Sequence, residues 1–181
     1  ALAVTAVVSI FLLTTPIPDP HTLREREVVE STKIFDHTGD TLLFEIYNEE
    51  KRTVIPFEEI PRNVKNAAIA IEDNNFYNHP GISVFSIIRA FLNDLMRGHI
   101  LVQGGSTITQ QLVKNTLLTG EKTIPRKLKE AILAIKIERI YTKDEILNMY
   151  LNEIPYGSNA YGIEAAAQTF FGKSARDVTL T

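Results

Sequence analysis

From Pro61 onward the chain consists of segments with helical periodicity, most of them ended by glycine, proline or a capping signal. Two of the predicted helix starts have capping-box spacing, namely Thr107 with Gln110 and Thr142 with Glu145. We predict helices over 62–73, 83–97, 106–118, 125–141, 143–152 and 162–170. A chain with this pattern folds into a mainly α-helical domain, and we find no internal repeat in it.

The first residues of the chain are uncharged and almost wholly apolar over 1–13. A helix that spans a membrane needs about 20 such residues, so this run is short for a complete span. We interpret it as the end of a transmembrane anchor; the apolar region of a signal peptide and a buried core segment are the alternatives. The charged stretch from Asp19 to Glu30 fits an exit from the membrane into water.

Between the apolar run and the helical part lies a connector of a different character. Three prolines within 14–21 predict a stiff, non-helical segment. The alternation over 31–55, with a turn signal at 36–40, predicts a small β-hairpin followed by a short strand near 52–56. We therefore predict three parts: an anchor over 1–13, a connector over 14–56 and the main domain over 57–181.

The net charge and the lack of cysteine exclude several classes of function. The formal net charge is −3, which argues against a dedicated nucleic-acid-binding protein because affinity for the phosphate backbone depends on an excess of basic residues. The chain contains no cysteine. Disulfides, thiolate metal sites and cysteine nucleophiles are therefore excluded.

The segment 72–81, Glu-Asp-Asn-Asn-Phe-Tyr-Asn-His-Pro-Gly, places two carboxylates, an aromatic ring and an imidazole after an apolar helix. The helix dipole disfavours an anion at that end, and a carboxylate with a disfavoured charged form is a good proton acceptor. Pro80 disfavours helical geometry at His79, so the chain turns there. The cluster is either an acid/base site or a solvated helix end with a hydrogen-bonded turn histidine. The pattern does not decide whether Glu72 or Asp73 acts.

A second candidate site begins at the paired glycines 104–105, directly before Ser106 and Thr107. Free N–H groups at the start of a helix bind anions. Thr107, Gln111 and Lys114 are spaced so that they share one helix face, which offers a hydroxyl, an amide and an ammonium group to a pyrophosphate. The alternative is that Thr107 only caps the helix and that Lys114 is solvated.

The next helix begins with a cluster of positive charge from Lys122, Arg126 and Lys127. Glu130 shares a face with apolar residues further along, so it must be paired, protonated or directed into a cavity. An ordinary salt bridge between Arg126 and Glu130 on a solvated face is the alternative. Four later residues suit either a carbohydrate site or the core, and we favour the core: Tyr150, Asn152, Tyr156 and Tyr161.

These motifs together resemble the peptidoglycan glycosyltransferase family, the transglycosylase domain of class A penicillin-binding proteins and of monofunctional transglycosylases. The family motifs E-D-x-x-F-x-x-H-x-G, G-G-S-T-I-T-Q-Q, R-K-x-x-E and I-L-x-x-Y-L-N are matched at 72–81, 104–111, 126–130 and 146–152. The resemblance covers about residues 30–181. It implies a mainly α, two-lobed, lysozyme-like glycosyltransferase domain with a small N-terminal β appendage and a membrane-anchor remnant.

The resemblance implies that the protein polymerises lipid II into β-1,4-linked glycan strands and releases undecaprenyl pyrophosphate. Glu72 is then the general base for the acceptor GlcNAc 4-hydroxyl, whose oxygen attacks C1 of the donor MurNAc with inversion. Glu130 corresponds to the family's second essential glutamate. Asp73, Phe76 and His79 shape the surroundings of the base. The residues implied to bind the substrate pyrophosphate are Ser106, Thr107, Gln111, Lys114, Lys122, Arg126 and Lys127.

The same resemblance implies the partners and the location of the protein. The partners are lipid II, the growing glycan chain, the bacterial cytoplasmic membrane and other cell-wall synthesis proteins, with no nucleic acid. A single-pass anchor holds the domain on the outer face of that membrane. No cofactor is required, although Glu130 and a pyrophosphate together offer hard oxygen ligands to Mg or Mn.

Two alternative functions and one question of domain organisation stay open at this point. A glycan-cleaving lysozyme-like enzyme, such as a lytic transglycosylase, is the nearest enzymatic alternative. A catalytically silent membrane scaffold is the alternative from another class. The presence of a transpeptidase domain after the chain is also open, and the β-like segment 31–56 slightly favours a bifunctional member because it resembles the connector found there.

Overall fold

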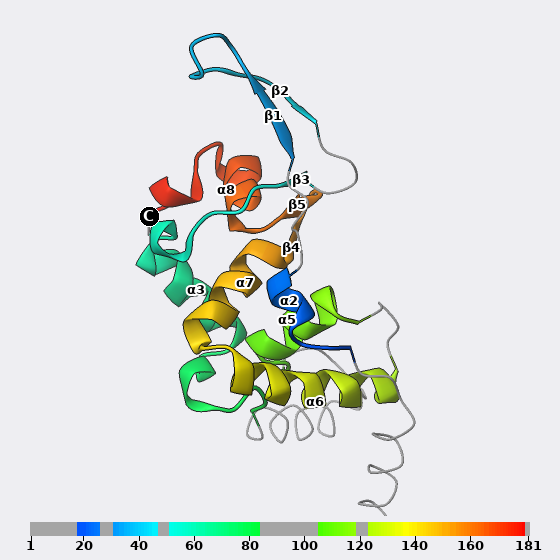
Figure 1. Cartoon of the computed structure of the whole chain (residues 1–181). Coiled ribbons are helices and arrows are strands. Elements are labelled where there is room, and N and C mark those ends of the chain that lie inside the picture. Colours follow the sequence, from blue (N-terminus) through cyan, green and yellow to red (C-terminus); the bar gives the residue numbers. More distant parts are fainter. Residues whose placement is uncertain (1–17, 26–30, 47–50, 84–104, 119–122, 180–181) are drawn as a thin grey trace, which may run out of the picture.

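The computed structural model describes residues 18–25, 31–46, 51–83, 105–118 and 123–179 (Figure 1). Three predictions fall on other parts of the chain, namely the anchor at 1–13, nearly all of the helix over 83–97, and the role of Lys122. Within the described ranges, no helix has the length and apolar character needed to cross a membrane.

Helices make up most of the described structure, so the mainly α class is confirmed, while the division into two lobes stays a prediction. The long helices are α3 (Arg62–Glu72), α5 (Ile108–Thr116), α6 (Ile124–Ile140), α7 (Lys143–Glu153) and α8 (Ile163–Phe171). Each lies within two residues of a predicted range. The short ones are α2 (Thr22–Glu25) and the 3-10 turns η1 (Phe57–Glu59), η2 (Phe76–Asn78) and η3 (Ala175–Asp177).

Local sequence signals account for the starts of three helices. Thr107 and Thr142 each accept a hydrogen bond from the backbone N–H three residues later, and the side chains of Gln110 and Glu145 accept in return. Both predicted capping boxes are therefore confirmed. Pro125 lies in the first turn of α6, where its missing N–H costs nothing.

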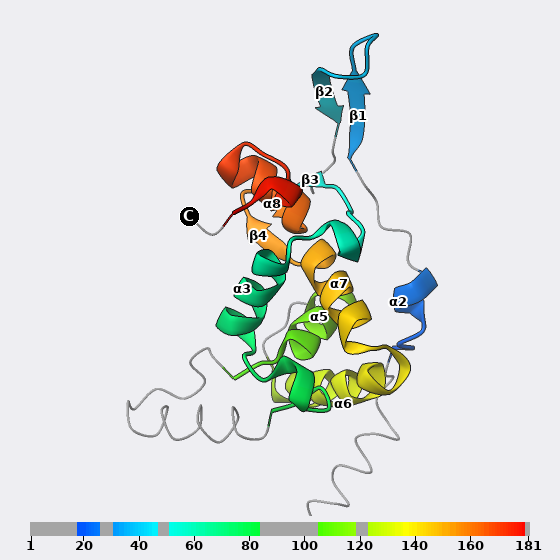
Figure 2. The same ribbon diagram turned by 90° about the vertical axis from the view of Figure 1, so that its left-hand side faces the viewer.

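The predicted hairpin is confirmed: β1 (Thr32–Phe35) pairs antiparallel with β2 (Leu42–Ile46) around the turn at 36–40. It extends away from the helices in both views (Figures 1 and 2). Four of its large apolar side chains are exposed: Ile34, Phe35, Leu43 and Phe44.

A second, smaller sheet joins the connector to the segment that directly follows α7. β3 (Lys51–Arg52) runs parallel to β5 (Ala160–Tyr161), which runs antiparallel to β4 (Pro155–Gly157). Beside it, Arg52 Nη1 donates to Glu153 Oε2 at 2.7 Å. These contacts attach the connector firmly to the end of α7.

The hydrophobic core lies where α5, α6 and α7 pack together (Figure 2). Ile108 and Leu112 of α5 are fully buried on the core side of this helix. Their main partners on the other helices are also fully buried: Leu133, Ile137, Ile146, Leu147 and Leu151. Burial of each such side chain contributes about 1.5–3 kcal/mol, so this core holds α5 in place.

Gly81 allows the loop after η2 to pass directly against α6. Its φ is +89°, and a Cβ atom there would lie 2.7 Å from the carbonyl oxygen of Ala134 and 2.9 Å from Glu138 Cγ. We expect Gly81→Ala to lower the free energy of unfolding by at least about 2 kcal/mol, because left-handed strain adds to a clash with the backbone. Urea denaturation measures this loss.

Gly39→Ala is the matched control for Gly81→Ala. Gly39 has a φ of +81°, but nothing lies within 4 Å of its Cβ position. It should lose only about 1 kcal/mol, the cost of the left-handed backbone alone. Equal losses in the two variants would contradict the importance of the close approach to α6.

Candidate active site

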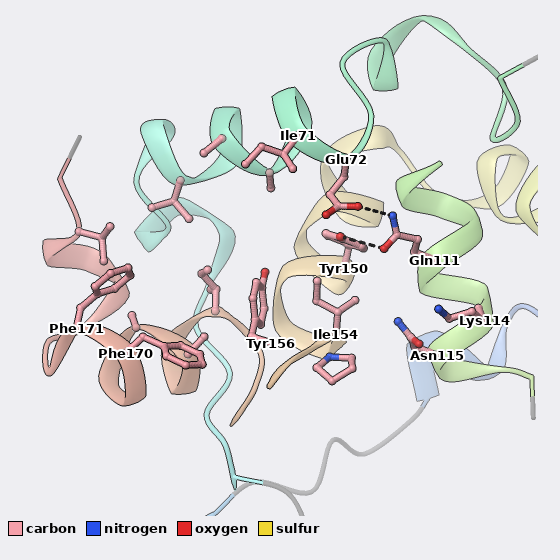
Figure 3. Close-up of a pocket in the computed structure, with 18 residues that line it drawn as sticks. Ile71, Glu72, Gln111, Lys114, Asn115, Tyr150, Ile154, Tyr156, Phe170 and Phe171 are labelled. Carbon is pink, nitrogen blue, oxygen red and sulfur yellow. Dashed lines mark hydrogen bonds between the residues drawn. The ribbon is translucent and has the colours of Figure 1, made fainter. Parts of the chain in front are cut away.

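A pocket with a volume of about 660 Å³ is bordered by α3, α5, α7 and α8 (Figure 3). One end is polar, with side chains contributed by Glu72, Gln111, Lys114, Asn115 and Tyr150. The other end is apolar and is formed largely by Phe170 and Phe171, whose side chains are exposed. The pocket can thus accept an amphiphilic ligand whose polar part lies against α3 and α5.

Glu72 is the last residue of α3, and its exposed side chain lies at the polar end of the pocket. Its Oε2 atom accepts a hydrogen bond from Gln111 Nε2 at 2.7 Å. Tyr150 donates its hydroxyl hydrogen to Gln111 Oε1 at 3.4 Å. Tyr150 is only 2% exposed. Burial, reinforced by the negative charge of Glu72, raises the pKa of Tyr150, so the phenol stays protonated.

The segment after Glu72 folds back on itself around a buried pair. His79 Nε2 lies 2.8 Å from Asp73 Oδ2, and the N–H of Gly81 donates to His79 Nδ1 at 3.2 Å. A ring nitrogen that accepts a hydrogen bond carries no proton. We infer that His79 is neutral and that its Nε2–H donates to an ionised Asp73.

The carboxylate of Asp73 also occupies the start of α5. The N–H of Ile108, the first residue of that helix, donates to Asp73 Oδ2 at 3.1 Å. The hydroxyl of Thr107 donates to the carbonyl of Gly81 at 2.6 Å and accepts from the N–H of Gln110. At this helix start the structure therefore places a carboxylate of the protein itself on the N–H of Ile108, and the Thr107 hydroxyl is already engaged. The binding of a substrate anion there stays a prediction.

A second charged cluster links α6 to the segment before α5. Glu130 is 1% exposed, and Arg126 Nη1 donates to its Oε2 at 2.9 Å. Lys127 Nζ contacts the other oxygen of Glu130 and donates to Ser106 Oγ at 2.6 Å. Arg126 Nε is buried and has no hydrogen-bond partner among the described residues. Glu130 is therefore paired, and the cluster keeps an excess of one positive charge.

Comparison with known families matches residues 39–181 to the family described as Transglycosylase. The chain belongs to the transglycosylase family. It is 46% identical over 164 residues to Penicillin-binding protein 1A of Aquifex aeolicus, covering 91% of this chain and 22% of that protein. It is 47% identical over 151 residues to Penicillin-binding protein 1F of Bacillus subtilis, with coverages of 83% and 21%.

A third relative gives the same result. The chain is 44% identical over 168 residues to Penicillin-binding protein 1A of Pseudomonas aeruginosa, which covers 93% of this chain and 20% of that protein. The chain spans about a fifth of the length of these curated relatives. The family inferred from the ordered motifs is confirmed.

The pocket of this transglycosylase brings together only some of the residues predicted from the motifs. Three of the predicted residues line it: Glu72, Gln111 and Lys114. The described predicted residues outside its lining are Asp73, Phe76, His79, Ser106, Thr107, Arg126, Lys127 and Glu130. Phe76 is fully buried, and its ring lies beside that of His79 at a centroid distance of 6.3 Å.

Sequence reasoning missed Asn115 as a pocket residue. It follows Gln111 by four positions on α5, so helical spacing alone places it next to the predicted face. Tyr150 belongs to the core as favoured, Tyr156 is partly buried and packs against it, and both also line the pocket. A core position and a place in the pocket lining are therefore compatible for these tyrosines.

The surroundings of Glu130 do not fit a divalent metal ion. Both of its carboxylate oxygens already contact cationic side chains, Arg126 and Lys127, whose charges repel a second cation. Within the described part of the chain, no three His, Asp or Glu residues are grouped in a way that could hold a metal. We therefore derive no step through a metal at this cluster.

The buried Asp73 should be important for stability. An amide at this position keeps the shape of the side chain but has only one accepting oxygen and no charge. The hydrogen bonds from His79 and Ile108 are therefore weaker than those to the carboxylate. We expect Asp73→Asn to lower the free energy of unfolding by about 1–3 kcal/mol, because a buried donor is left without its charged partner. Thermal or urea denaturation measures this. The exposed Asp177→Asn serves as control, and a loss of similar size there would contradict the special role of the buried pair.

Proposed function

We propose that this transglycosylase domain polymerises lipid II into β-1,4-linked glycan strands in bacterial cell-wall synthesis, with Glu72 as the general base. The observation that carries the proposal is the pocket in which the carboxylate of Glu72 and the ammonium of Lys114 line the same polar end. Such a pair offers a proton acceptor and a cation for a departing anion in one site.

The proposed reaction needs no nucleophile from the protein. Glu72 takes the proton of the acceptor GlcNAc 4-hydroxyl, and the oxygen attacks C1 of the donor MurNAc. The bond from C1 to the pyrophosphate oxygen breaks, the undecaprenyl pyrophosphate leaves with the electron pair, and C1 is inverted to the β configuration. The domain contributes a base, positioning and electrostatic stabilisation of the leaving group.

We propose that side chains of α5 and α6 bind the leaving pyrophosphate. Lys114 is exposed at the polar end of the pocket. Arg126 and Lys127 are held by the buried Glu130, which leaves the cluster with net positive charge and an Arg126 Nε–H that has no partner among the described residues. In this assignment Glu130 acts as a positioning residue for the two cations, and Ser106 is ordered by Lys127. Lys122 joins them by the family resemblance.

The apolar end of the pocket agrees with a lipid-linked substrate, because exposed aromatic side chains there tolerate an apolar or carbohydrate surface. We further propose that residues 1–13 are the end of a single-pass anchor. The domain then acts on the outer face of the bacterial cytoplasmic membrane, where lipid II and the growing glycan chain are its partners. Other cell-wall synthesis proteins would associate with it there.

The main test substitutes the proposed base. Glu72→Gln keeps the size of the side chain and its contact with Gln111 but cannot accept a proton. We expect polymerisation of purified lipid II to fall by about 10²-fold or more, the usual contribution of a general base. Electrophoresis of the glycan product measures the rate, and thermal melting checks that the fold is unchanged.

The exposed Glu58→Gln is the matched control, since it also replaces one carboxylate by an amide but lies outside the pocket lining. It should polymerise at the rate of the wild type. Cleavage of preformed glycan without synthesis would instead support a lytic transglycosylase. Full activity of Glu72→Gln would exclude Glu72 as the base, and a wild type that neither makes nor cleaves glycan would favour a silent scaffold.

A second prediction concerns the anion-binding end of the pocket. Lys114→Ala should weaken binding of a pyrophosphate-linked lipid by about 10–100-fold, because one charge-assisted hydrogen bond contributes about 1.5–3 kcal/mol. Binding is measured with a fluorescent lipid pyrophosphate, and added salt should reduce the difference. The exposed Lys136→Ala on α6 is the control for net charge. Unchanged affinity and turnover in Lys114→Ala would remove this lysine from the site.

A further inference from the structure

Three side chains at the polar end of the pocket form a continuous hydrogen-bonded chain (Figure 3). Tyr150 donates to Gln111 Oε1 at 3.4 Å, and Gln111 Nε2 donates to Glu72 Oε2 at 2.7 Å. We propose that Gln111 and Tyr150 are positioning residues that orient the carboxylate of Glu72 for proton abstraction. This inference rests on the proposed role of Glu72 as the base, and it gives Gln111 a task other than binding pyrophosphate.

The chemistry of the two neighbours permits only one orientation of the Gln111 amide. An ionised Glu72 can only accept hydrogen bonds, so it must face the NH₂ end of the amide. The hydroxyl of Tyr150 is the donor for the carbonyl end. Exchange of the two ends would bring oxygen against oxygen at Glu72 and leave the phenol without its acceptor. The chain of contacts is therefore directional, from the core toward the base.

Tyr150 anchors this chain in the rigid part of the molecule. It lies on α7 among fully buried neighbours, including Leu147 and Leu151, and is itself nearly inaccessible to solvent. Its pKa is raised by burial, so the hydroxyl keeps its proton over the whole working range of pH. A fixed donor on a fixed ring holds the amide of Gln111 in one place.

Glu72 needs a hydrogen-bonding partner from another helix because α3 itself does little to restrain the Glu72 side chain. It is the last residue of α3, its side chain is exposed, and the last turn of that helix contains no basic residue. A side chain in this situation samples several rotamers, and only some of them point at the acceptor hydroxyl. The bond from Gln111 restrains Oε2. Oε1 accepts no hydrogen bond from any described residue, so this oxygen is left to accept the substrate proton.

Two roles of Gln111 predict different kinetic effects. A positioning residue acts on the step in which the proton leaves the acceptor hydroxyl, so its loss lowers kcat more than it raises KM. A pyrophosphate ligand behaves differently, because its loss weakens substrate binding and raises KM. The two roles of Gln111 can thus be separated by experiment.

The experiment uses Gln111→Met and Tyr150→Phe in the full chain. Methionine keeps the length of Gln111 without a donor, and phenylalanine keeps the buried ring of Tyr150. We expect kcat for lipid II polymerisation to fall about tenfold or more in Gln111→Met and less in Tyr150→Phe, with KM changed less than threefold. Tyr77→Phe is the control, because it removes a phenol that bonds to Asp144 outside the pocket.

A second readout does not depend on activity. The carboxylate signal of Glu72 is followed at neutral pH by ¹³C NMR of labelled glutamates and assigned by its absence in Glu72→Gln. Its chemical shift should change in Gln111→Met and Tyr150→Phe and stay constant in Tyr77→Phe, because the first two variants remove or loosen the donor on Oε2. An unchanged signal, or a raised KM with unchanged kcat, would overturn the positioning role. A wild type that makes no polymer refutes the proposed function instead, and the carboxylate signal still decides whether Gln111 and Tyr150 orient this carboxylate.

Discussion

The buried carboxylate of Asp73 determines how the two helices that bear the candidate site meet. It receives a hydrogen bond from His79 and another from the N–H of Ile108, so it joins the end of α3 to the start of α5. An ionised group can stay buried only while its donors stay in place. Glu72 precedes Asp73 directly, and its position opposite Gln111 is therefore a consequence of this buried pair.

The same pair extends into a network that includes α7. Lys143 Nζ donates to the carbonyl of His79 at 2.7 Å and lies 4.4 Å from the centre of the Phe76 ring. It also donates to Glu138 of α6. Residues 73–81 are thus connected to α5 and α7 through polar contacts, and through Lys143 to α6, while the apolar core packs behind them. This explains why residues that touch no pocket can still control the geometry of Glu72.

The parts of the structure that the sequence predicted well are those decided by neighbouring residues. Capping boxes and the hairpin turn act within a few positions, so the starts of α5 and α7 and the β1–β2 pairing were predicted correctly. The pairing of β3 with β5 was missed, because it joins residues about 110 positions apart and no local pattern encodes it. The contact between Glu72 and Gln111 is of the same kind, since the residues are 39 positions apart.

The start of α5 shows a more instructive difference. Its sequence predicted an anion-binding helix start, since the glycines and the threonine leave N–H groups to be satisfied. Which anion lies there depends on the tertiary structure, and in this structure it is the carboxylate of Asp73. A substrate anion must then be bound by side chains beyond this point. Lys114 in the last turn of α5, with Arg126 and Lys127 on the adjacent helix, can supply the needed charge.

This distribution of charge gives α5 two separate tasks. At its first turn the protein's own carboxylate complements the positive end of the helix dipole and stabilises the fold. At its exposed face, one to two turns later, Gln111 and Lys114 lie open to the pocket. A ligand can therefore enter and leave without breaking the contact that holds α3 and α5 together. A site whose anion-binding groups also stabilised the helix start would lose stability each time the product departed.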